Sequence, residues 1–200
     1  MSNQFTLQEP KQFKVKLKAP FLDQKPGTSG LRKSSKQFEE PHYLESFIES
    51  ILQTLPNVKG GTLILGGDGR YGNCRAIQTI IRMAAAHGVS RVVTTLDGIL
   101  STPAASNLIR KEQAVGGIIL SASHNPGGVD GDFGVKLNGS NGGPANETLT
   151  NQVYDYSKSL GEYNIIDSVD IPLDAEAIFS LGNLSVEVID GVDAYVDLMK

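Results

Sequence analysis

The order of apolar stretches and helical periodicities along the chain is the feature that most constrains its fold. Residues 44–55 place apolar side chains at i, i+3, i+4, i+7, i+8 and i+11, one face of a helix, and Pro56 ends that helix. Residues 117–121 form a continuously apolar strand, the type that is buried on both faces of a parallel sheet. The other expected strands are residues 13–21, 62–65, 91–96, 133–137 and 184–189, and the other expected helices begin near Asn73, Thr102 and Asn146.

Because strands and helices alternate with short connections, we predict a three-layer α/β/α fold with a mixed, mostly parallel sheet. Asn73 is expected to cap a helix that ends at Gly88. Thr102 is expected to cap a helix that has Pro103 at its first position. Residues 161–183 are only weakly patterned, and we expect them to be a linker or an irregular wrap.

The domain organisation follows from length and from the last ten residues. Two hundred residues with 40% hydrophobic content suffice for one domain with a core. The last ten residues, GVDAYVDLMK, have the pattern of a helix that is just beginning. We therefore expect residues 1–190 to form one domain and residues 191–200 to begin the next, in a chain that is part of something longer.

Charge is distributed unevenly along the chain. Residues 1–36 hold eight basic and two acidic side chains, whereas residues 141–200 hold two basic and eleven acidic ones. Within the basic segment, lysines at 14, 16 and 18 alternate with apolar residues at 13, 15 and 17. This alternation favours an amphipathic strand with a solvated lysine face over an arm that binds nucleic acid.

Composition excludes several classes of protein. Tryptophan is absent and only 6% of residues are aromatic, so a stacking platform for single-stranded nucleic acid is not expected. The single cysteine, Cys74, excludes a disulfide scaffold, and we expect its side chain to be packed. No apolar run approaches the roughly 18 residues of a membrane span, and the N-terminus has no signal-peptide core. These features predict a soluble cytoplasmic protein with neither a nucleic-acid nor a membrane partner.

Three loops leave predicted strands at the edge of the sheet where ligands collect. They are GGDGRYG at 66–72, DGILSTP at 97–103 and SASHNPGG at 121–128. The first formally matches G-x-G-x-x-G between a strand and a helix, the context of dinucleotide binding. Asp68 and Arg70 are bulky charged groups at positions where backbone amides should meet pyrophosphate, so a glycine turn is the favoured interpretation.

Ser123 lies two residues beyond a buried strand, in the loop richest in chemistry. The G-x-S-x-G elbow of acyl-transfer enzymes is absent, as is the phosphate-binding G-x-x-x-x-G-K-[ST] loop. His124 is poorly placed as a base for its own neighbour, because adjacent side chains in extended backbone diverge. From spacing alone, Ser123 can be a turn residue, a nucleophile or a carrier of phosphate.

Three stretches together resemble the α-D-phosphohexomutase superfamily, and most closely its phosphoglucomutase branch. They are PGTSGLRK at 26–33, GGDGRYG with GILSTPA at 98–104, and GGIILSASHNPGG continuing through GDFGVKLN and SNGGPA. The similarity covers nearly all of residues 21–160. It implies that this chain is the first of four domains.

The resemblance implies roles for four residues. The serine that matches Ser123 carries a phosphoryl group, donates it to the sugar phosphate, and is rephosphorylated from the bisphosphate intermediate. Arg32 is expected beside this phosphate, His124 and Lys136 are expected in the same site, and Lys136 is a candidate general base. Preorganised positive charge of this kind stabilises a transferring phosphoryl group. A lysine that acts as a base needs a lowered pKa, which crowding by Arg32 can assist.

The resemblance also implies Mg²⁺, bound between the phosphate on Ser123 and three aspartates of a D-G-D-G-D-R loop. That loop is missing from these 200 residues. Asp130 and Asp132 stand in the family's ordinary turn before the lysine strand, so we interpret them as structural. His42 and His87 are far apart in sequence and have no metal-ligand spacing.

The function implied is that of a phosphoglucomutase acting on a sugar phosphate, with glucose 1,6-bisphosphate as activator and intermediate. The alternatives are a phosphomannomutase or another sugar-phosphate mutase, a non-catalytic scaffold protein, and a dinucleotide-binding domain at Gly67–Gly72. Retention of Arg32, Ser123, His124 and Lys136 argues against a scaffold. The 200-residue piece alone is expected to be inactive. Oligomeric state stays open.

Overall fold

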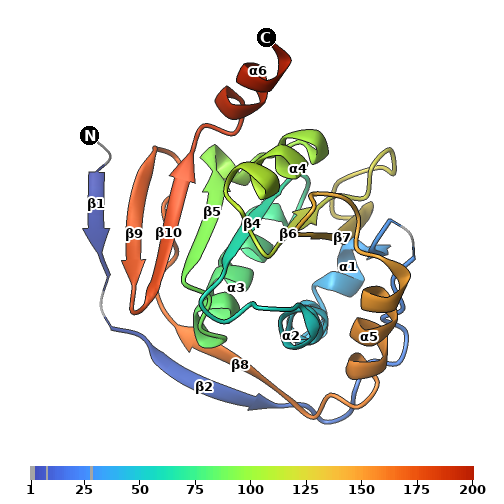
Figure 1. Cartoon of the computed structure of the whole chain (residues 1–200). Helices are drawn as coiled ribbons and strands as arrows, with labels where there is room; N and C mark the ends of the chain where they lie inside the picture. Colours follow the sequence, from blue (N-terminus) through green and yellow to red (C-terminus); the bar gives the residue numbers. More distant parts are fainter. Residues whose placement is uncertain (1–2, 8, 28) are drawn as a thin grey trace.

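The computed structural model describes residues 3–7, 9–27 and 29–200, so Thr28 of the PGTSGLRK segment lies outside the described residues. Within these ranges, eight strands form the main sheet in the order β1-β9-β10-β5-β4-β6-β7-β3, and two more, β2 and β8, form a small second sheet (Figure 1). The strands are β1 Asn3–Thr6, β2 Lys11–Lys16, β3 Leu31–Ser34, β4 Thr62–Gly67, β5 Arg91–Thr95, β6 Gly116–Leu120, β7 Asp132–Gly139, β8 Glu162–Asp167, β9 Ala177–Leu181 and β10 Leu184–Ile189. The helices are α1 Ser35–Phe38, α2 Tyr43–Thr54, α3 Asn73–Ala86, α4 Thr102–Lys111, α5 Glu147–Ser157 and α6 Asp193–Met199, and a 3₁₀ turn, η1, covers Leu96–Gly98.

The main sheet has helices on both faces, as predicted. Successive side chains of a strand point to opposite faces, and β4 shows the result: Leu63 and Leu65 join the core beneath α2 and α3, whereas Ile64 joins the core beneath α4. Helix α5 packs against α2, and α6 contacts α4 (Figure 1). Parallel pairs join β1 to β9, β10 to β5, β5 to β4 and β4 to β6, while β9–β10, β6–β7 and β7–β3 are antiparallel. The predicted three-layer fold with a mixed, mostly parallel sheet is confirmed.

Two helix caps differ from the sequence-based expectation. Helix α3 is capped by Gly72 in the left-handed region (φ +85°), a conformation that glycine adopts at little cost, and Asn73 is its buried first residue. Helix α4 is capped by Ser101, whose Oγ accepts the backbone N–H of Ala104 at 3.3 Å. The expected caps at Asn73 and Thr102 are therefore each one residue late. Gly88, with φ +72°, lies just beyond the end of α3 as predicted.

The expectation of an irregular wrap at 161–183 is wrong. This segment contains β8, which pairs with β2, and β9, which pairs with both β1 and β10. Strands β1 and β3 were not expected either. These strands are four to six residues long, so each has few residues in which to show a period. Each of the four also pairs with a strand far away in the sequence.

The pairing of β2 with β8 brings the basic N-terminal part of the sequence next to its acidic C-terminal part. In register, Lys11 lies opposite Asp167 and Lys16 opposite Glu162. Lys14 Nζ also forms an ion pair of 2.9 Å with Glu162. The lysines are exposed, so the predicted solvated lysine face is present, and it lies against acidic side chains from the other end of the chain.

The connections around β4 place a crevice at one edge of the sheet. From β4 the chain passes through α3 to β5 on one side, and then through α4 on the opposite face to β6 on the other side of β4. Such a reversal of strand order opens a space beyond the carboxyl ends of the strands, where α/β proteins bind ligands. The loops that follow β4 and β6 meet at this point.

Candidate functional site

Ser123 lies in the loop between β6 and β7, at this edge of the sheet. Its side chain is exposed, and its backbone has φ +55°, in the left-handed region that residues other than glycine seldom adopt. Such strained conformations gather at functional sites when the surrounding structure holds them in place.

Two cations converge on the hydroxyl of Ser123. Arg32 Nη2 donates to Ser123 Oγ at 2.9 Å, and Lys136 Nζ donates to the same oxygen at 3.1 Å. Arg32 on β3 lies opposite Gly134 on β7, and Lys136 is two residues beyond Gly134. Both side chains therefore leave the same face of the β3–β7 pair. The predicted proximity of Arg32, Ser123 and Lys136 is present in the structure.

The charge around Ser123 Oγ is positive, and the Asp68 carboxylate acts on Lys136 only through space, without an ion pair. Within the described ranges, neither Arg32 nor Lys136 forms an ion pair with a carboxylate. Nε of Arg32 is buried and has no hydrogen-bond partner among the described residues. Burial, and after it the positive charge of Arg32, lowers the pKa of Lys136 below its usual value. The arrangement suits an anion with several acceptor oxygens.

Two glycines let the strands and the loop come this close. A Cβ on Gly134 would lie 2.3 Å from the carbonyl oxygen of Ser121, and one on Gly30 would lie 2.3 Å from that of Val135. Gly30 also has φ +84°. Glycine is required at both positions, because the backbone of Ser121 lies against Gly134 and the backbone of Val135 lies against Gly30.

His124 follows Ser123, but the structure does not bring its side chain into this cluster. It is exposed, and none of the hydrogen bonds or ion pairs among the described residues involves it. Its role remains a prediction.

Asp68 and Arg70 belong to the site, although the sequence suggested only a glycine turn there. Arg70 Nη2 donates to the carbonyl of Ser123 at 3.2 Å, and Arg70 Nη1 donates to the carbonyl of Asp132 at 2.6 Å. Three further bonds of 2.8 to 3.1 Å join its guanidinium to the Asp68 carboxylate. The available signal was their position in a loop that leaves a parallel strand, the same criterion that selected Ser123.

The glycine-turn interpretation of residues 67–72 agrees with the hydrogen bonds. The N–H of Asp68 donates to Leu120, that of Arg70 to the side chain of Asp68, and that of Asn73 to the carbonyl of Arg70. These amides are already satisfied and do not form an open cradle for pyrophosphate.

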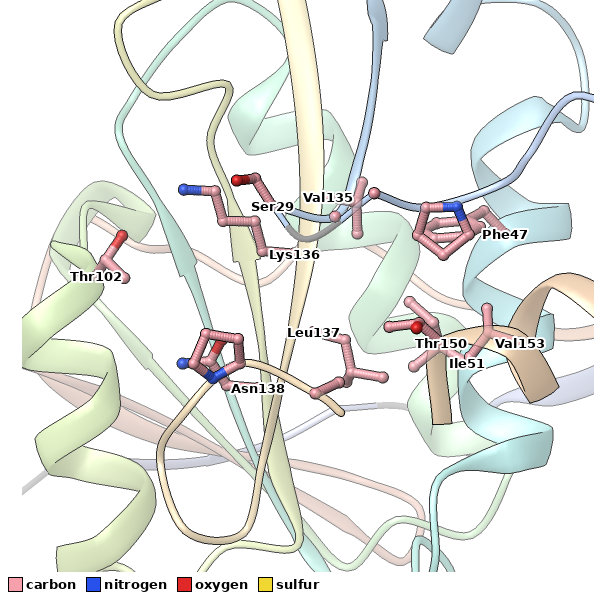
Figure 2. A pocket seen from close by; sticks show the side chains of 15 residues that line it. Ser29, Phe47, Ile51, Thr102, Val135, Lys136, Leu137, Asn138, Thr150 and Val153 are labelled. Atoms are coloured by element: carbon pink, nitrogen blue, oxygen red, sulfur yellow. The ribbon is translucent and has the colours of Figure 1, made fainter. Parts of the chain in front are cut away.

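An apolar pocket lies beside the cationic cluster. Figure 2 shows Lys136 and Ser29 at one side of it, while Phe47, Ile51 and Val153 from α2 and α5 line the other. The stem of Lys136 borders this pocket, so the burial that lowers its pKa has a visible origin.

The remaining polar candidates are structural. Asp130 forms an ion pair with Lys36, and Asp132 Oδ2 accepts a hydrogen bond of 2.7 Å from the side chain of Asn125, as expected of turn residues. Among residues 3–7, 9–27 and 29–200, no three His, Cys, Asp or Glu side chains gather into a group that can hold a metal ion. Cys74 is exposed, so its expected packing is wrong. Of the helices in these ranges, none has the length and apolar character to cross a membrane.

Comparison with known proteins adds to this geometry. The model of the family described as "Phosphoglucomutase/phosphomannomutase, alpha/beta/alpha domain I" matches residues 23–164. This range contains every side chain of the cluster around Ser123.

Individual relatives agree. A phosphoglucomutase of Aspergillus oryzae is 53% identical over 181 residues, which are 90% of this chain and 33% of that protein. Phosphoglucomutase-1 of Bos taurus is 49% identical over 195 residues, which are 93% of this chain and 34% of that protein. The crystal structure of the exocytosis-sensitive phosphoprotein pp63/parafusin of Paramecium, described as a phosphoglucomutase in its open form, superposes with a TM-score of 0.88 at 40% identity, covering 97% of this chain and 37% of that one. This chain thus spans about a third of the length of these relatives.

Proposed function

The chain belongs to the phosphoglucomutase/phosphomannomutase family, and from this premise we propose that the complete protein is a phosphoglucomutase. It interconverts glucose 1-phosphate and glucose 6-phosphate through a phosphoryl group carried on Ser123. The relatives at about half identity bear that name, and this chain supplies the serine and its cationic surroundings.

One observation carries the proposal: two cations that form no ion pair within the described part of the chain meet at the oxygen of a single exposed serine. A neutral hydroxyl does not need two positive donors, whereas a phosphoryl group on that oxygen presents a dianion with three acceptor oxygens. The guanidinium of Arg32 can donate several hydrogen bonds to this phosphoryl group, including one from Nε, which has no hydrogen-bond partner among the described residues. Charge that spreads over the phosphoryl group during transfer is stabilised by the same preorganised donors.

Each half-reaction exchanges one P–O bond for another. In the first, a hydroxyl of the sugar phosphate attacks the phosphorus on Ser123, the bond from phosphorus to Ser123 Oγ breaks, and glucose 1,6-bisphosphate forms. The sugar hydroxyl loses a proton and the departing Oγ gains one. In the second, Ser123 Oγ attacks the other phosphoryl group of the bisphosphate, with the opposite proton movement at the two oxygens.

Lys136 donates a proton to Ser123 Oγ in one half-reaction and accepts one from it in the other. As an ammonium group it donates to that oxygen at 3.1 Å, so it can protonate Oγ when the phosphoryl group leaves. In its neutral form, which its lowered pKa makes more accessible, it takes the hydroxyl proton when Ser123 attacks. We also propose that His124 contributes to the catalytic site, because it is the residue next to Ser123 in the same loop.

Mg²⁺ is the metal we propose. A phosphate oxygen on Ser123 is the ligand this chain offers, since Mg²⁺ prefers phosphate and carboxylate oxygens, and Asp68, the nearby carboxylate, is held by Arg70. Among the described residues, no three His, Cys, Asp or Glu side chains gather into a metal site. We propose that the carboxylate ligands belong to the two thirds of the relatives' length that this chain does not span. When bound, the ion neutralises charge on the transferring phosphoryl group. Glucose 1,6-bisphosphate is the proposed activator, and the free thiol of Cys74 suits a reducing cytoplasmic location.

The test uses the complete protein and its Ser123→Ala variant. We expect peptide mass spectrometry to find phosphate on Ser123 in the wild type, and the variant to lose mutase activity at least about 1000-fold, because no covalent intermediate can form. Ser140→Ala, an exposed loop serine, is the matched control and should retain activity. Full activity without Ser123, or a residue 123 that is never phosphorylated after incubation with glucose 1,6-bisphosphate, contradicts the proposal.

A further inference from the structure

We propose that Asp68 is a positioning residue, which acts through Ser121 and Arg70 to fix the backbone of Ser123 so that Oγ meets its two cations. This inference rests on the proposed function of Ser123 as the carrier of the phosphoryl group. It assigns a role to a carboxylate that touches neither Ser123 Oγ nor Arg32 or Lys136 in the structure.

The first half of the network holds the N–H of Ser123. That N–H donates to Ser121 Oγ at 3.0 Å. The hydroxyl of Ser121 lies close enough to Asp68 that hydrogen bonding from it, after that from Arg70, helps to hold the pKa of the Asp68 carboxyl below its usual value. Because Ser121 is buried, its hydroxyl has few alternatives, and the carboxylate sets its orientation so that the lone pair faces the amide.

The second half holds the C=O of Ser123. The carbonyl accepts from Arg70 Nη2 at 3.2 Å, and the guanidinium is fixed by Asp68 through Nε and Nη2. The Arg70 side chain is 7% exposed, so it is packed as well as paired. The carboxylate of Asp68, which lies in the loop after the neighbouring strand β4, thus acts on both the N–H and the C=O of Ser123.

This arrangement explains how a serine keeps φ +55°. Residues other than glycine hold the left-handed conformation only where the surroundings over-determine it. If the network loosens, the backbone of Ser123 relaxes toward its ordinary range and Oγ turns away from its donors. The pairing of β3 with β7 and of β7 with β6 places Arg32 and Lys136, so the cations remain while the nucleophile moves. The charge of Asp68 acts on Lys136 only by raising its pKa.

Asp68→Asn is the most informative substitution, because it keeps the shape of the side chain, removes the negative charge that holds the Arg70 guanidinium, and leaves Arg32 and Lys136 unsubstituted. A misplacement of about 1 Å at a reacting atom can cost about 100-fold in rate. We therefore expect kcat of the complete protein to fall about 10- to 100-fold, with KM for glucose 1-phosphate changed less than about twofold. The rate at which glucose 1,6-bisphosphate phosphorylates Ser123 should fall in parallel.

Ser121 supplies the second variant. Ser121→Ala removes the hydroxyl and should lower kcat to a similar degree, whereas Ser121→Thr keeps the hydroxyl and should restore most of the rate. Both residues act on the amide of Ser123, so their effects should not add. We expect kcat of the double variant Asp68→Asn with Ser121→Ala to lie within about twofold of kcat of the slower single variant. Asp170→Asn, which breaks a remote Asp–Arg pair with Arg82, is the matched control and should leave kcat unchanged.

The inference is overturned if Asp68→Asn has wild-type kcat, if its effect is confined to KM, or if Ser121→Thr is as slow as Ser121→Ala. Ser123→Ala separates this failure from that of the proposed function. If Ser123→Ala is inactive and Asp68→Asn is fully active, only the positioning role of Asp68 is contradicted. If Ser123→Ala is active, the proposed function and the positioning role are both contradicted.

Discussion

In the proposed mechanism, the protonation state of Lys136 decides whether its side chain donates a proton to Ser123 Oγ or accepts one from it. Its Nζ lies against that oxygen, and burial together with the charge of Arg32 lowers its pKa. The neutral form is the base for the rephosphorylation of the serine, so the rate of this step should rise with pH as Lys136 loses its proton. The rise should be centred below the ordinary lysine pKa of about 10.4.

Lys136→Arg tests this assignment. An arginine keeps the positive charge at every accessible pH, so phosphate binding should survive while proton transfer at Ser123 Oγ is lost. We expect kcat to fall by about 100- to 10,000-fold and the rise of rate with pH to disappear, measured from pH 6 to 9.5 with a coupled assay of glucose 6-phosphate. Lys14→Arg, an exchange in an exposed ion pair, should keep the wild-type profile. A Lys136→Arg enzyme with the wild-type pH dependence would refute the role of Lys136 as a base.

Gly134 sets the clearance between the serine loop and β7. In a Gly134→Ala variant, Cβ would lie 2.3 Å from the Ser121 carbonyl oxygen, and both neighbours are backbone. We expect a loss of about 1–3 kcal/mol in the free energy of unfolding, as for other overpacked sites, together with lower mutase activity. Gly161→Ala places its Cβ in open space and should change neither quantity in urea denaturation and activity assays. Equal stability of the two variants would contradict this account.

Part of the site could be predicted from the sequence because the chemistry is local. Ser123 was marked by its loop after a buried strand, and the family motif added Arg32 and Lys136. Asp68 and Arg70 also stand in a loop that leaves a strand, but their role could not be assigned, because their partners, Ser121 and the carbonyl of Ser123, lie about fifty residues away. Hydrogen bonds between loops of neighbouring strands require knowledge of the strand order.

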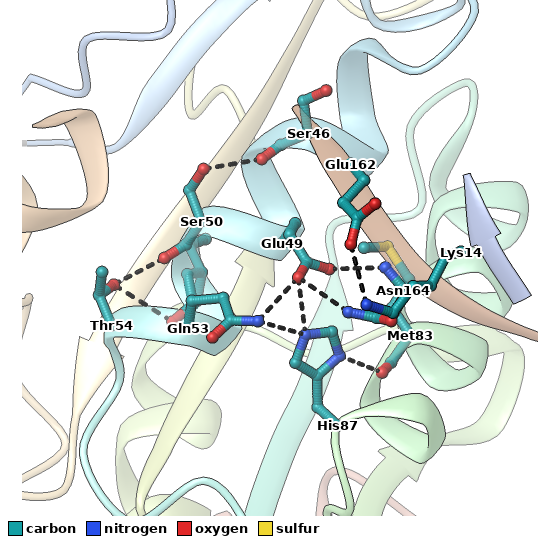
Figure 3. Close-up of polar contacts among 11 residues, drawn as sticks. Lys14, Ser46, Glu49, Ser50, Gln53, Thr54, Met83, His87, Glu162 and Asn164 are labelled. Atoms are coloured by element: carbon teal, nitrogen blue, oxygen red, sulfur yellow. Dashed lines mark hydrogen bonds and ion pairs between the residues drawn. The ribbon is translucent and has the colours of Figure 1, made fainter. Parts of the chain in front are cut away.

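Helices α2 and α3 are joined to β8 by a buried polar network (Figure 3). Glu49 of α2 is almost fully buried and accepts from His87 Nε2 at 3.1 Å, from Gln53 at 2.9 Å and from the backbone N–H of Asn164 at 3.0 Å. His87 Nδ1 lies 2.8 Å from the Met83 carbonyl. Burial opposes the charge on both groups, but hydrogen bonds outweigh it: the pKa of Glu49 lies below its ordinary value and that of His87 above.

This network should make stability depend on pH. The raised pKa of His87 means that its contribution is full below the unfolded value of about 6.5 and is lost as pH rises through the folded pKa. The lowered pKa of Glu49 means that its contribution is full above about 4.3 and is lost as pH falls. We expect the pair to stabilise the fold most between about pH 4.5 and 6.5.

Glu49→Gln should cost about 1–3 kcal/mol at pH 6, because His87 and the amide of Asn164 lose a charged acceptor. It should also flatten the fall in stability between pH 6 and 8, as should His87→Gln. Urea denaturation at several pH values measures both effects. An unchanged slope in both variants would show that other groups set the pH dependence.

At the scale of elements, the sequence patterns predicted every described helix of ten or more residues, but they missed strands β1, β3, β8 and β9. Helix α2 repeats its apolar face over three turns and was predicted to within a residue. Strands β3 and β9 are only four and five residues long and are specified by β7, β10 and β1 rather than by their own periodicity. The caps at Gly72 and Ser101 were missed because each has a capping residue as its neighbour.

For the molecule as a whole, the described residues supply the serine and its cations but no group of metal ligands. We therefore expect the 200-residue chain alone to show no mutase turnover, at least about 1000-fold below the complete protein, because a phosphoryl transfer without its metal loses most of its charge stabilisation. A coupled assay with Mg²⁺ and glucose 1,6-bisphosphate measures this, with circular dichroism as a check that the chain is folded. Turnover by the chain alone would contradict the proposed origin of the metal ligands.

The two N-terminal strands have a consequence for synthesis. Asn3 of β1 pairs with Ala177 of β9, and Lys11 of β2 pairs with Asp167 of β8. At about 5–20 residues per second, a ribosome needs roughly 10 to 35 seconds to extend the chain across that interval. During this time the first strands have no partner, and Phe5 and Phe13 stand on open edges that invite pairing with other nascent chains. The lysines of β2, which later lie beside acidic side chains of β8, give these unpaired segments the same charge, and like charges placed opposite each other disfavour strand pairing.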